Sequence, residues 1–346
     1  MRLPGALLGL LAAASFGISA PLAKALLVEI EPVLLAGLLY FGAALGLWGH
    51  RLFVGPSREA GLARGDVPLL ALVVLAGGVL APLSMLLGLS RVSALTGSLL
   101  LNLEAPLTIA LAVLFFGEHL SRRALVAAAF IVLGAAVLRL EGETAAGGVP
   151  GILFLAGACA LWGLDNNLTQ RLSSKDPFAV VRIKTLGAGT FNLVLALFVL
   201  RLPWPSWPSV CGALLLGVVS YGLSVVLDAY ALRLVGAARE AAYFATAPFM
   251  GALTAVVVLG ESLHPTDGLA LVSMAVGVIL LLREQHAHLH THEELTHDHL
   301  HVHDEHHQHP HGADDPPGEP HAHVHHHVRL VHDHPHVSDI HHRHEH

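Results

Sequence analysis

The chain has 346 residues, of which 54% are hydrophobic and only 13% are charged. A soluble domain carries about 25% charged residues, so this composition excludes an ordinary soluble protein and favours a membrane protein. Residues 1–283 hold 17 Lys/Arg and 14 Asp/Glu, whereas residues 284–346 hold 2 Lys/Arg and 12 Asp/Glu. The chain therefore divides into an apolar body and an acidic tail. The chain has no basic patch of the kind that binds nucleic acid. Its two cysteines, Cys159 and Cys211, lie in apolar runs and indicate neither a disulfide framework nor a zinc site.

The apolar body contains ten segments that we expect to be membrane-spanning helices, since a span needs about 20 apolar residues. In chain order they are 5–24, 33–53, 67–87, 92–116, 124–140, 150–170, 178–200, 209–231, 238–260 and 266–283. Pro, Gly or charged residues separate them, and most connections are short. The first segment, with Arg2 before it and Ile18-Ser19-Ala20 near its end, also resembles a signal peptide. Residues 157–170 repeat part of this segment, which favours a helix that is retained in the mature protein.

The distribution of Lys and Arg predicts the orientation in the membrane. With the N-terminus inside, twelve Lys/Arg residues fall in inner segments and four fall in outer segments, namely Lys24, Arg91, Arg139 and Arg201. Because positively charged connections stay in the cytoplasm, we expect both termini and the tail to be cytoplasmic. The expected location is the inner (cell) membrane.

Two echoes in the sequence indicate an internal duplication. Residues 99–120 and 243–263 each contain an Ala-Pro pair and then a Gly-Glu pair, and Gly117-Glu118 and Gly260-Glu261 are 143 residues apart. Phe16-Gly17 returns as Trp162-Gly163, 146 residues later. We therefore predict two repeats, residues 1–141 and 142–283, followed by the tail, residues 284–346. Because five is an odd number of helices, the second repeat starts on the opposite side of the membrane and is inverted. This arrangement predicts a pseudo-two-fold axis in the membrane plane and a substrate site near the midplane.

The same residues resemble a known family. The stretch LEAPLTIALAVLFFGEHL, its counterpart TAPFMGALTAVVVLGESL, Phe16-Gly17 with Lys24, and Trp162-Gly163 with Asn166-Asn167 resemble EamA-type members of the drug/metabolite transporter superfamily. The resemblance covers residues 1–283 and implies a ten-helix exporter or exchanger with a central cavity, but no single substrate. The chain departs from the family pattern at Phe16, where tryptophan is usual, and at Gln170, where the first repeat has Lys24.

Polar residues inside the apolar segments are the candidates for substrate binding, because a charge in hydrocarbon costs about 2.5–3.5 kcal/mol on insertion scales. Glu104 lies near mid-depth, and we expect it either to bind a proton or a cationic group in the cavity, or to pair with a neighbouring helix. Lys184 has two interpretations as well, snorkelling toward the inner surface or pairing with an acidic group or an anionic substrate. The full set of candidates is Asn102, Glu104, Trp162, Asp165, Asn166, Lys184, Asn192 and Tyr243.

A second set of residues is expected to have gating or structural roles. Pro106 and Pro248 follow alanine in the two echoed segments and permit helix kinks. Glu118 and Glu261 close their helices, and we expect each to bond to backbone groups at the end of a neighbouring helix.

The tail contains 24 of the 27 histidines, and its prolines and scarcity of apolar residues predict disorder in the absence of a ligand. Alternating histidines suit weakly bound, exchangeable Zn, Ni or Co ions, although no cofactor is required. The candidate metal ligands are His286, His288, His290, His292, His297, His299, His301, His303, His321, His323, His325, His332, His334 and His336. Three uses stay open, namely sensing metal to regulate transport, buffering metal, and feeding ions to a translocation path.

The sequence thus predicts an all-α membrane protein with two inverted five-helix repeats and a disordered tail. The predicted function is export of small organic metabolites, such as amino acids or amines, by alternating access. The alternative is a transition-metal (Zn, Ni or Co) exporter loaded by the tail, and a non-transporting receptor is a further option. We find no paired nucleophile and base, phosphate loop or HExxH motif that would indicate an enzyme. The expected partners are a small-molecule substrate, membrane lipid and metal ions, with a homodimer left open.

Overall fold

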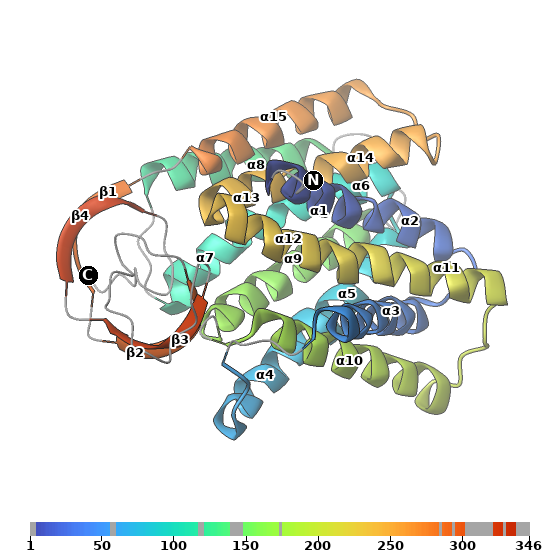
Figure 1. Ribbon diagram of the computed structural model, residues 1–346. Coiled ribbons are helices and arrows are strands. Elements are labelled where there is room, and N and C mark those ends of the chain that lie inside the picture. Colours follow the sequence, from blue (N-terminus) through green and yellow to red (C-terminus); the bar gives the residue numbers. More distant parts are fainter. Residues whose placement is uncertain are drawn as a thin grey trace.

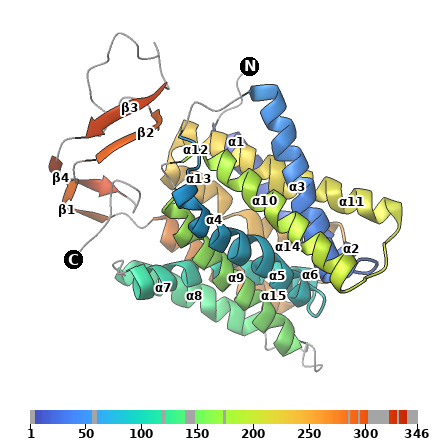
Figure 2. The same cartoon turned by 90° about the horizontal axis from the view of Figure 1, so that it is seen from below.

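A computed structural model describes residues 5–55, 60–116, 121–138, 148–172 and 175–283 of the body. In the tail it describes residues 286–292, 295–301, 321–327 and 330–336. All regular structure in the described part of the body is helical, as the sequence predicts. Figures 1 and 2 show these helices packed in one bundle, with the strands of the tail gathered beyond one of its ends.

The first half of the body folds into helices at the five predicted segments. The first segment contains α1 (Gly5–Gly17) and α2 (Ser19–Leu26), and the second is α3 (Pro32–Val54). The third is built from the 3-10 turn η1 (Arg64–Asp66), α4 (Val67–Val73), the π-helix η2 (Val74–Leu80) and α5 (Ala81–Leu89). The fourth is α6 (Ala94–Leu100), the 3-10 turn η3 (Leu101–Leu103) and α7 (Glu104–Phe116), and the fifth is α8 (Arg122–Leu138).

The second half has a matching series of helices. It begins with α9 (Gly148–Gln170) and continues with α10 (Pro177–Val194) and the π-helix η4 (Leu195–Val199). The next rod is α11 (Trp207–Gly217), the π-helix η5 (Val218–Leu223) and α12 (Ser224–Val235). The last two segments are α13 (Ala237–Phe244) with α14 (Ala247–Val257), and α15 (Pro265–Leu282).

Nine helical rods in the described part of the chain are long and apolar enough to cross a membrane, whereas the sequence predicts ten. They are Gly5–Leu26, Pro32–Val54, Arg64–Leu89, Ala94–Phe115, Gly148–Gln170, Pro177–Val199, Trp207–Leu232, Arg239–Val257 and Pro265–Leu282. The remaining predicted segment, 124–140, corresponds to α8, whose 17 residues are at the lower limit for a span. Residues 139–147, which follow α8, lie outside the described residues.

Prolines and capping side chains determine where several helices begin. Pro32, Pro177 and Pro265 occupy the first positions of α3, α10 and α15, where the missing N–H group has no partner within the helix to lose. Ser93 accepts a hydrogen bond from the amide of Thr96 at 3.0 Å and so caps α6. Asp176 accepts from the amide of Phe178 at 2.9 Å and caps α10.

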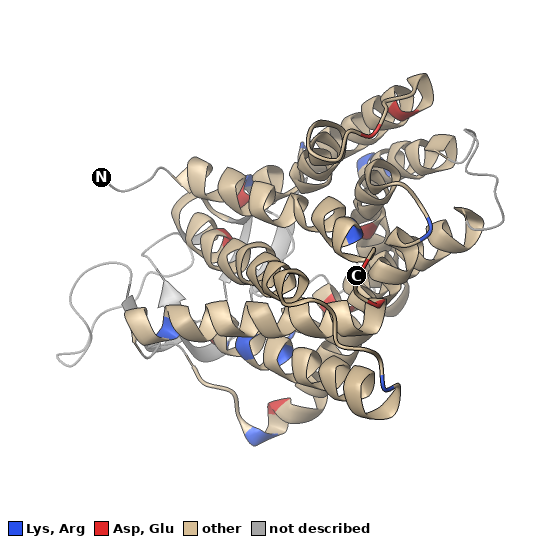
Figure 3. Cartoon of the chain, turned by 90° about the vertical axis from the view of Figure 1, so that its right-hand side faces the viewer, with Lys and Arg blue, Asp and Glu red and all other residues tan. Residues whose placement is uncertain are grey.

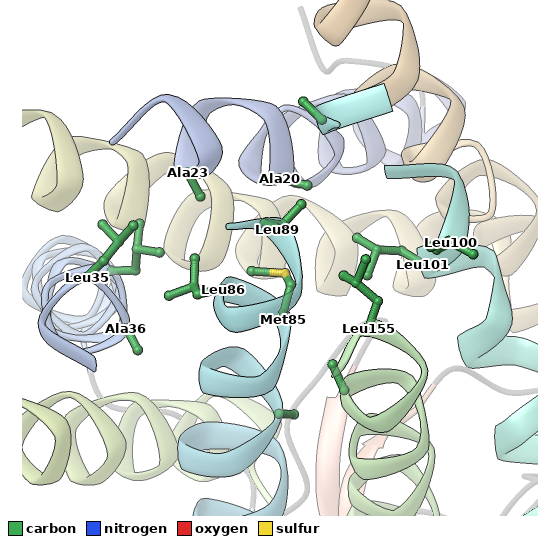
Figure 4. Close-up of a cluster of buried hydrophobic side chains, with 14 of the residues drawn as sticks. Ala20, Ala23, Leu35, Ala36, Met85, Leu86, Leu89, Leu100, Leu101 and Leu155 are labelled. Atoms are coloured by element: carbon green, nitrogen blue, oxygen red, sulfur yellow. The ribbon is translucent and has the colours of Figure 1, made fainter. Parts of the chain in front are cut away.

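The core lies where α5 passes between helices of both halves. Figure 4 shows Met85 and Leu89 of α5 among Ala23 of α2, Leu35 of α3 and Leu155 of α9, and all five side chains are buried. Small residues on neighbouring helices let the backbones approach closely, which is the usual way that membrane helices pack.

The contact between α8 and α15 is reciprocal. A Cβ atom built on Gly134 of α8 would lie 2.9 Å from the carbonyl oxygen of Ala270, and one built on Gly277 of α15 would lie 2.7 Å from that of Ala127. Gly134 and Gly277 are 143 residues apart, and so are Ala127 and Ala270, which is the offset of the two Gly-Glu pairs. Gly134, late in α8, meets Ala270, early in α15, and Gly277, late in α15, meets Ala127, early in α8. The helices α8 and α15 therefore run antiparallel.

The structure of the tail differs from the expected disorder. Four strands are present, β1 (His286–His292), β2 (Leu295–His301), β3 (His321–His327) and β4 (Leu330–His336). They form two antiparallel pairs, β1 with β4 and β2 with β3. Alternation of histidine with other residues has the period of a strand, and this pattern outweighs the low apolar content that favours disorder.

The two ends of the bundle can be told apart by the tail. The strands lie at the left of Figure 1, and the α10–α11 and α14–α15 connections lie at the right, at what we call the distal end. Figure 3, in which the distal end faces the viewer, shows that Lys, Arg, Asp and Glu are sparse along the helices. The few charges inside the spans are therefore the best markers of a functional site.

Candidate transport site

Glu104 is placed at a change in helix geometry. The chain passes from α6 through the 3-10 turn η3 into α7, whose first residue is Glu104, with Pro106 in the same turn. The Glu104 side chain is partly buried, and its Oε1 atom accepts a hydrogen bond from Nδ2 of Asn166 in α9 at 2.9 Å. Two candidates from different halves of the sequence are thus brought together.

Asp165 and Lys184 form a buried ion pair. The Lys184 ammonium of α10 contacts Oδ2 of Asp165 in α9, and the two side chains are 17% and 5% exposed. The hydroxyl of Thr169 donates to Oδ1 of Asp165 at 3.5 Å. Of the two interpretations of Lys184, the structure agrees with pairing to an acidic group and not with snorkelling to the surface.

The π-helix η2 supplies a backbone carbonyl to this region. The oxygen of Gly77 accepts hydrogen bonds from the Tyr40 hydroxyl at 3.0 Å and from Nε1 of Trp162 at 3.2 Å. A Cβ atom on Gly77 would overlap the carboxylate of Asp165. Gly77 thus joins α3, α9 and the third rod beside the ion pair, and π-helical turns of this kind are frequent at functional sites.

An aromatic cluster adjoins the polar groups. The ring of Tyr221 in η5 lies 5.6 Å from that of Tyr40 and 5.7 Å from that of Phe16, measured between centroids. Phe16 in turn lies 5.3 Å from Phe244. These distances are typical of favourable aromatic pairs. The cluster therefore runs continuously from α3 through η5 and α1 to α13.

Sequence reasoning missed Gly77, Tyr40 and Tyr221. Each lies in an apolar run with no charge beside it, so the amino-acid pattern alone gives no sign of a polar contact. The π-helices η2 and η5, which hold Gly77 and Tyr221, begin 144 residues apart, but only the structure reveals this correspondence. Helical periodicity cannot distinguish a π-helical turn from an α-helical one.

The remaining substrate-binding candidates lie in different surroundings. Asn102 is buried, and its Nδ2 donates to the carbonyl of Leu99 in the same rod at 2.9 Å and to Sδ of Met274 in α15 at 3.8 Å. Tyr243 packs on α1, since a Cβ atom on Gly9 would be 2.8 Å from its ring. Asn192 of α10 is 0% exposed, and neither atom of its amide has a hydrogen-bond partner within the described residues.

The neighbouring Asn167, which was not a candidate, has a packing role. Its side chain donates to the carbonyl oxygens of Gly163 at 2.8 Å and Thr108 at 3.2 Å. The second of these bonds ties α9 to α7, just as the Asn166–Glu104 bond does.

The expected gating or structural residues can be placed in part. Glu261 bonds to backbone groups of a neighbouring helix end, as its Oε1 and Oε2 atoms accept from the amides of Ala94 and Leu95, each at 2.7 Å. Pro106 and Pro248 both lie in the first turn of a helix, α7 and α14 respectively. Glu118 lies outside the described residues.

The described residues contain no group of three or more His, Cys, Asp or Glu side chains close enough to hold a metal ion. Of the histidines proposed as metal ligands, His303 lies outside the described residues and the other thirteen lie in the strands. In the pairing register, His286, His288 and His290 of β1 stand opposite histidines of β4. Three histidines of β2 stand opposite histidines of β3 in the same way.

Comparison with known proteins agrees with this arrangement. The EamA-like transporter family matches residues 3–140 and 149–283, one match for each half. An uncharacterized transporter from Methanothermobacter thermautotrophicus is 31% identical over 287 residues, covering 77% of this chain and 82% of its own length. A crystal structure of a protein with 19% identity has a TM-score of 0.59 and covers 80% of this chain and 96% of its own, which shows a shared fold. This chain is therefore a member of the EamA-like transporter family, an integral membrane transporter.

Proposed function

We propose that this protein exports small organic solutes that carry an amino group, such as amines or amino acids, by alternating access. The observation that carries the proposal is the polar cluster of Glu104, Asp165 and Lys184 in the interior of three spans. With all three groups ionised, the cluster has one net negative charge. Charged groups inside a membrane protein are costly and mark substrate or ion pathways.

The two carboxylates have different environments, which suggests different roles. Asp165 is neutralised by Lys184, whereas the Glu104 side chain has the neutral amide of Asn166 as its one hydrogen-bond partner among the described residues. Glu104 is therefore the group proposed to accept a substrate ammonium or a proton. Trp162, which is held by the Gly77 carbonyl, and Asn166 are proposed to contact the rest of the solute.

An inverted repeat is the proposed basis of alternating access. The reciprocal contacts of Gly134 and Gly277 support it, because two antiparallel helices related in this way are linked by a two-fold axis perpendicular to both. The matched π-helices η2 and η5 support it as well. Such an axis lies in the membrane plane, and rocking of one half against the other exposes a midplane site to each side in turn.

The direction of transport and the role of the tail are further parts of the proposal. The excess of Lys and Arg on one side supports cytoplasmic termini, so the tail is proposed to lie on the side from which an exporter loads. The facing histidines of the strand pairs support binding of Zn, Ni or Co by the tail. The second candidate function, export of these metal ions after loading by the tail, rests on the same histidines.

Uptake into inside-out vesicles tests these proposals together. Full-length protein and a version ending at Arg283 are supplied with radiolabelled amino acids and amines, and separately with zinc, nickel and cobalt. We expect saturable uptake of an amino-bearing solute by both versions, abolished by Glu104→Gln and unaffected by the control Glu143→Gln. Metal uptake that disappears on truncation would instead establish the metal exporter. Equal solute uptake by wild type and Glu104→Gln would contradict the assigned site.

A further inference from the structure

A surface pocket at the distal end lies apart from the polar cluster. It has a volume of about 430 Å³ and is formed by the connection between α2 and α3, the end of α5 and the segment after η4. Its lining combines four polar side chains with apolar ones from all three segments. The polar residues are Glu29, Glu31, Ser90 and Arg91.

The basic group of the pocket is held in place from one side. The Nη1 atom of Arg91 donates to the carbonyl of Leu87 and to the hydroxyl of Ser90 at 3.1 Å, and its guanidinium lies 5.0 Å from the centroid of the Phe154 ring. Both bonds use Nη1, so the N–H groups of Nη2 and Nε, which have no hydrogen bond to the described residues, are left for an anionic ligand. A guanidinium fixed in this way loses little rotational freedom when it binds an anion.

The acidic side of the pocket also has capacity for a ligand. Oε2 of Glu29 accepts from the hydroxyls of Ser206 at 2.9 Å and Ser209 at 2.5 Å, which fixes the carboxylate and leaves Oε1 for a ligand. Glu31 is exposed and precedes α3 without forming a side-chain cap. Two carboxylates in the same pocket as a held guanidinium provide sites for charges of both signs.

The backbone at the rim has an unusual conformation. Leu200 and Leu202 line the pocket, and Arg201 between them has a φ angle of +53°, the one positive φ of a residue other than glycine in the described chain. Arg201 follows η4, whose end is closed by a hydrogen bond from the amide of Leu202 to the carbonyl of Ala196 at 2.9 Å, and left-handed backbone is common at such helix ends. This turn shapes the rim, because it places Leu200 and Leu202 on the wall of the pocket.

We propose that this pocket binds a zwitterion, a molecule that carries a primary ammonium and an acidic group joined to an apolar part. The acidic group binds Arg91, the ammonium binds Glu31 and Glu29, and the apolar part contacts the leucines of the wall. Two sources have this chemistry, a free apolar amino acid and the headgroup of an aminophospholipid in the surrounding membrane. The site is separate from the polar cluster of Glu104 and does not depend on the function proposed for it.

Calorimetric titration of the full-length protein in detergent tests the proposal, with L-leucine and glycerophosphoethanolamine as probes. We expect at least one probe to bind saturably, with the dissociation constant raised about tenfold or more by Arg91→Gln and by Glu31→Gln. Arg91→Lys keeps the charge and is expected to recover part of the affinity. The matched control Arg123→Gln, at an exposed position of α8, should leave binding unchanged.

The probes distinguish the sources and the role of the ammonium. Binding of leucine identifies a free amino acid as ligand, and binding of glycerophosphoethanolamine identifies a lipid headgroup. Glycerol 3-phosphate, which lacks the ammonium, should be sensitive to Arg91→Gln and insensitive to Glu31→Gln. The proposal is overturned if neither zwitterion binds, or if both pocket substitutions leave the affinity unchanged.

Discussion

The Lys184 ammonium pairs with the Asp165 carboxylate in the interior of the bundle and links α10 to α9. Removing one partner of a buried pair leaves a charge without compensation, which costs about 3–5 kcal/mol. We therefore expect Lys184→Met and Asp165→Asn each to lower the free energy of unfolding by about that amount. The double substitution should recover most of the loss, because no unpaired charge remains.

Chemical unfolding in detergent, followed by tryptophan fluorescence, measures the three variants against wild type. Recovery in the double variant is the decisive observation, since it distinguishes charge pairing from loss of packing. A double variant that loses as much as the two single variants combined would contradict the pairing.

Gly77→Ala is the second test, because a Cβ atom at this position would overlap the Asp165 carboxylate. Overpacking of this kind costs about 1–3 kcal/mol, and here it also moves the ion pair. We expect a raised KM for the transported solute together with a lower unfolding free energy. Gly212→Ala is the matched control, because the atom nearest to a Cβ atom at that position would be Cδ2 of Leu26, at an ordinary contact distance of 3.6 Å. Equal KM values for the two variants would exclude a positioning role for Gly77.

Much of the fold follows from the sequence, for identifiable reasons. Apolar runs of span length, bounded by residues such as Pro32 and Pro265, locate the helices because hydrocarbon thickness dictates their length. The duplication follows from the paired Gly-Glu motifs. The fifth segment was predicted at 124–140 and α8 begins two residues earlier, at Arg122, because hydropathy changes gradually at a helix end.

The candidate site was predictable only where a charge or amide interrupts an apolar run. Glu104, Asn166, Asp165 and Lys184 were found on that basis, but their pairing was not, since it depends on how helices rotate against one another. The Gly77 carbonyl was hidden because every residue has a carbonyl and only the π-helical turn makes this one available. The strands of the tail had their signal in the alternating histidines, which were interpreted as ligands within a disordered chain.

Glu261 provides the third prediction, as it accepts from two amides at the start of α6. A carboxylate at this place satisfies free N–H groups and interacts favourably with the helix dipole. Glu261→Ala should lower stability by about 0.5–2 kcal/mol, and Glu261→Gln should lower it by less. Faster hydrogen exchange of the Ala94 and Leu95 amides is the measurement that reports the loss directly. Unchanged exchange at both amides in Glu261→Ala would show that the carboxylate does not cap α6.

The reciprocal glycines give the fourth prediction. Gly134→Val and Gly277→Val both insert side chains into the same antiparallel contact, so each should lower the unfolding free energy by a similar amount, about 1–3 kcal/mol. Gly268→Val on α15 is the matched control, because nothing lies within 4 Å of a Cβ atom there. Thermal unfolding of the three variants measures the effect. A large effect from only one of the two contact glycines would argue against a symmetric interface.

Glu29, in the connection between the first two spans, gives the last prediction. Hydrogen bonds from Ser209 and then Ser206 lower the pKa of its carboxyl from the ordinary value of 4.5. Since the folded pKa is the lower one, the contribution to stability is present above pH 4.5 and is lost as the pH falls through the folded pKa. Carboxyl ¹³C NMR should show Glu29 titrating below 4.5 in wild type.

The double variant Ser206→Ala/Ser209→Ala removes both donors, so the Glu29 titration should move upward. Its thermal unfolding temperature should fall below that of wild type at neutral pH, and this difference should shrink as the sample is acidified. In a Glu29→Gln background, which lacks the titrating group, the serine substitutions should change the thermal unfolding temperature by an amount that does not depend on pH. A wild-type titration unchanged by loss of both hydroxyls would show that the serines do not set the charge state of Glu29.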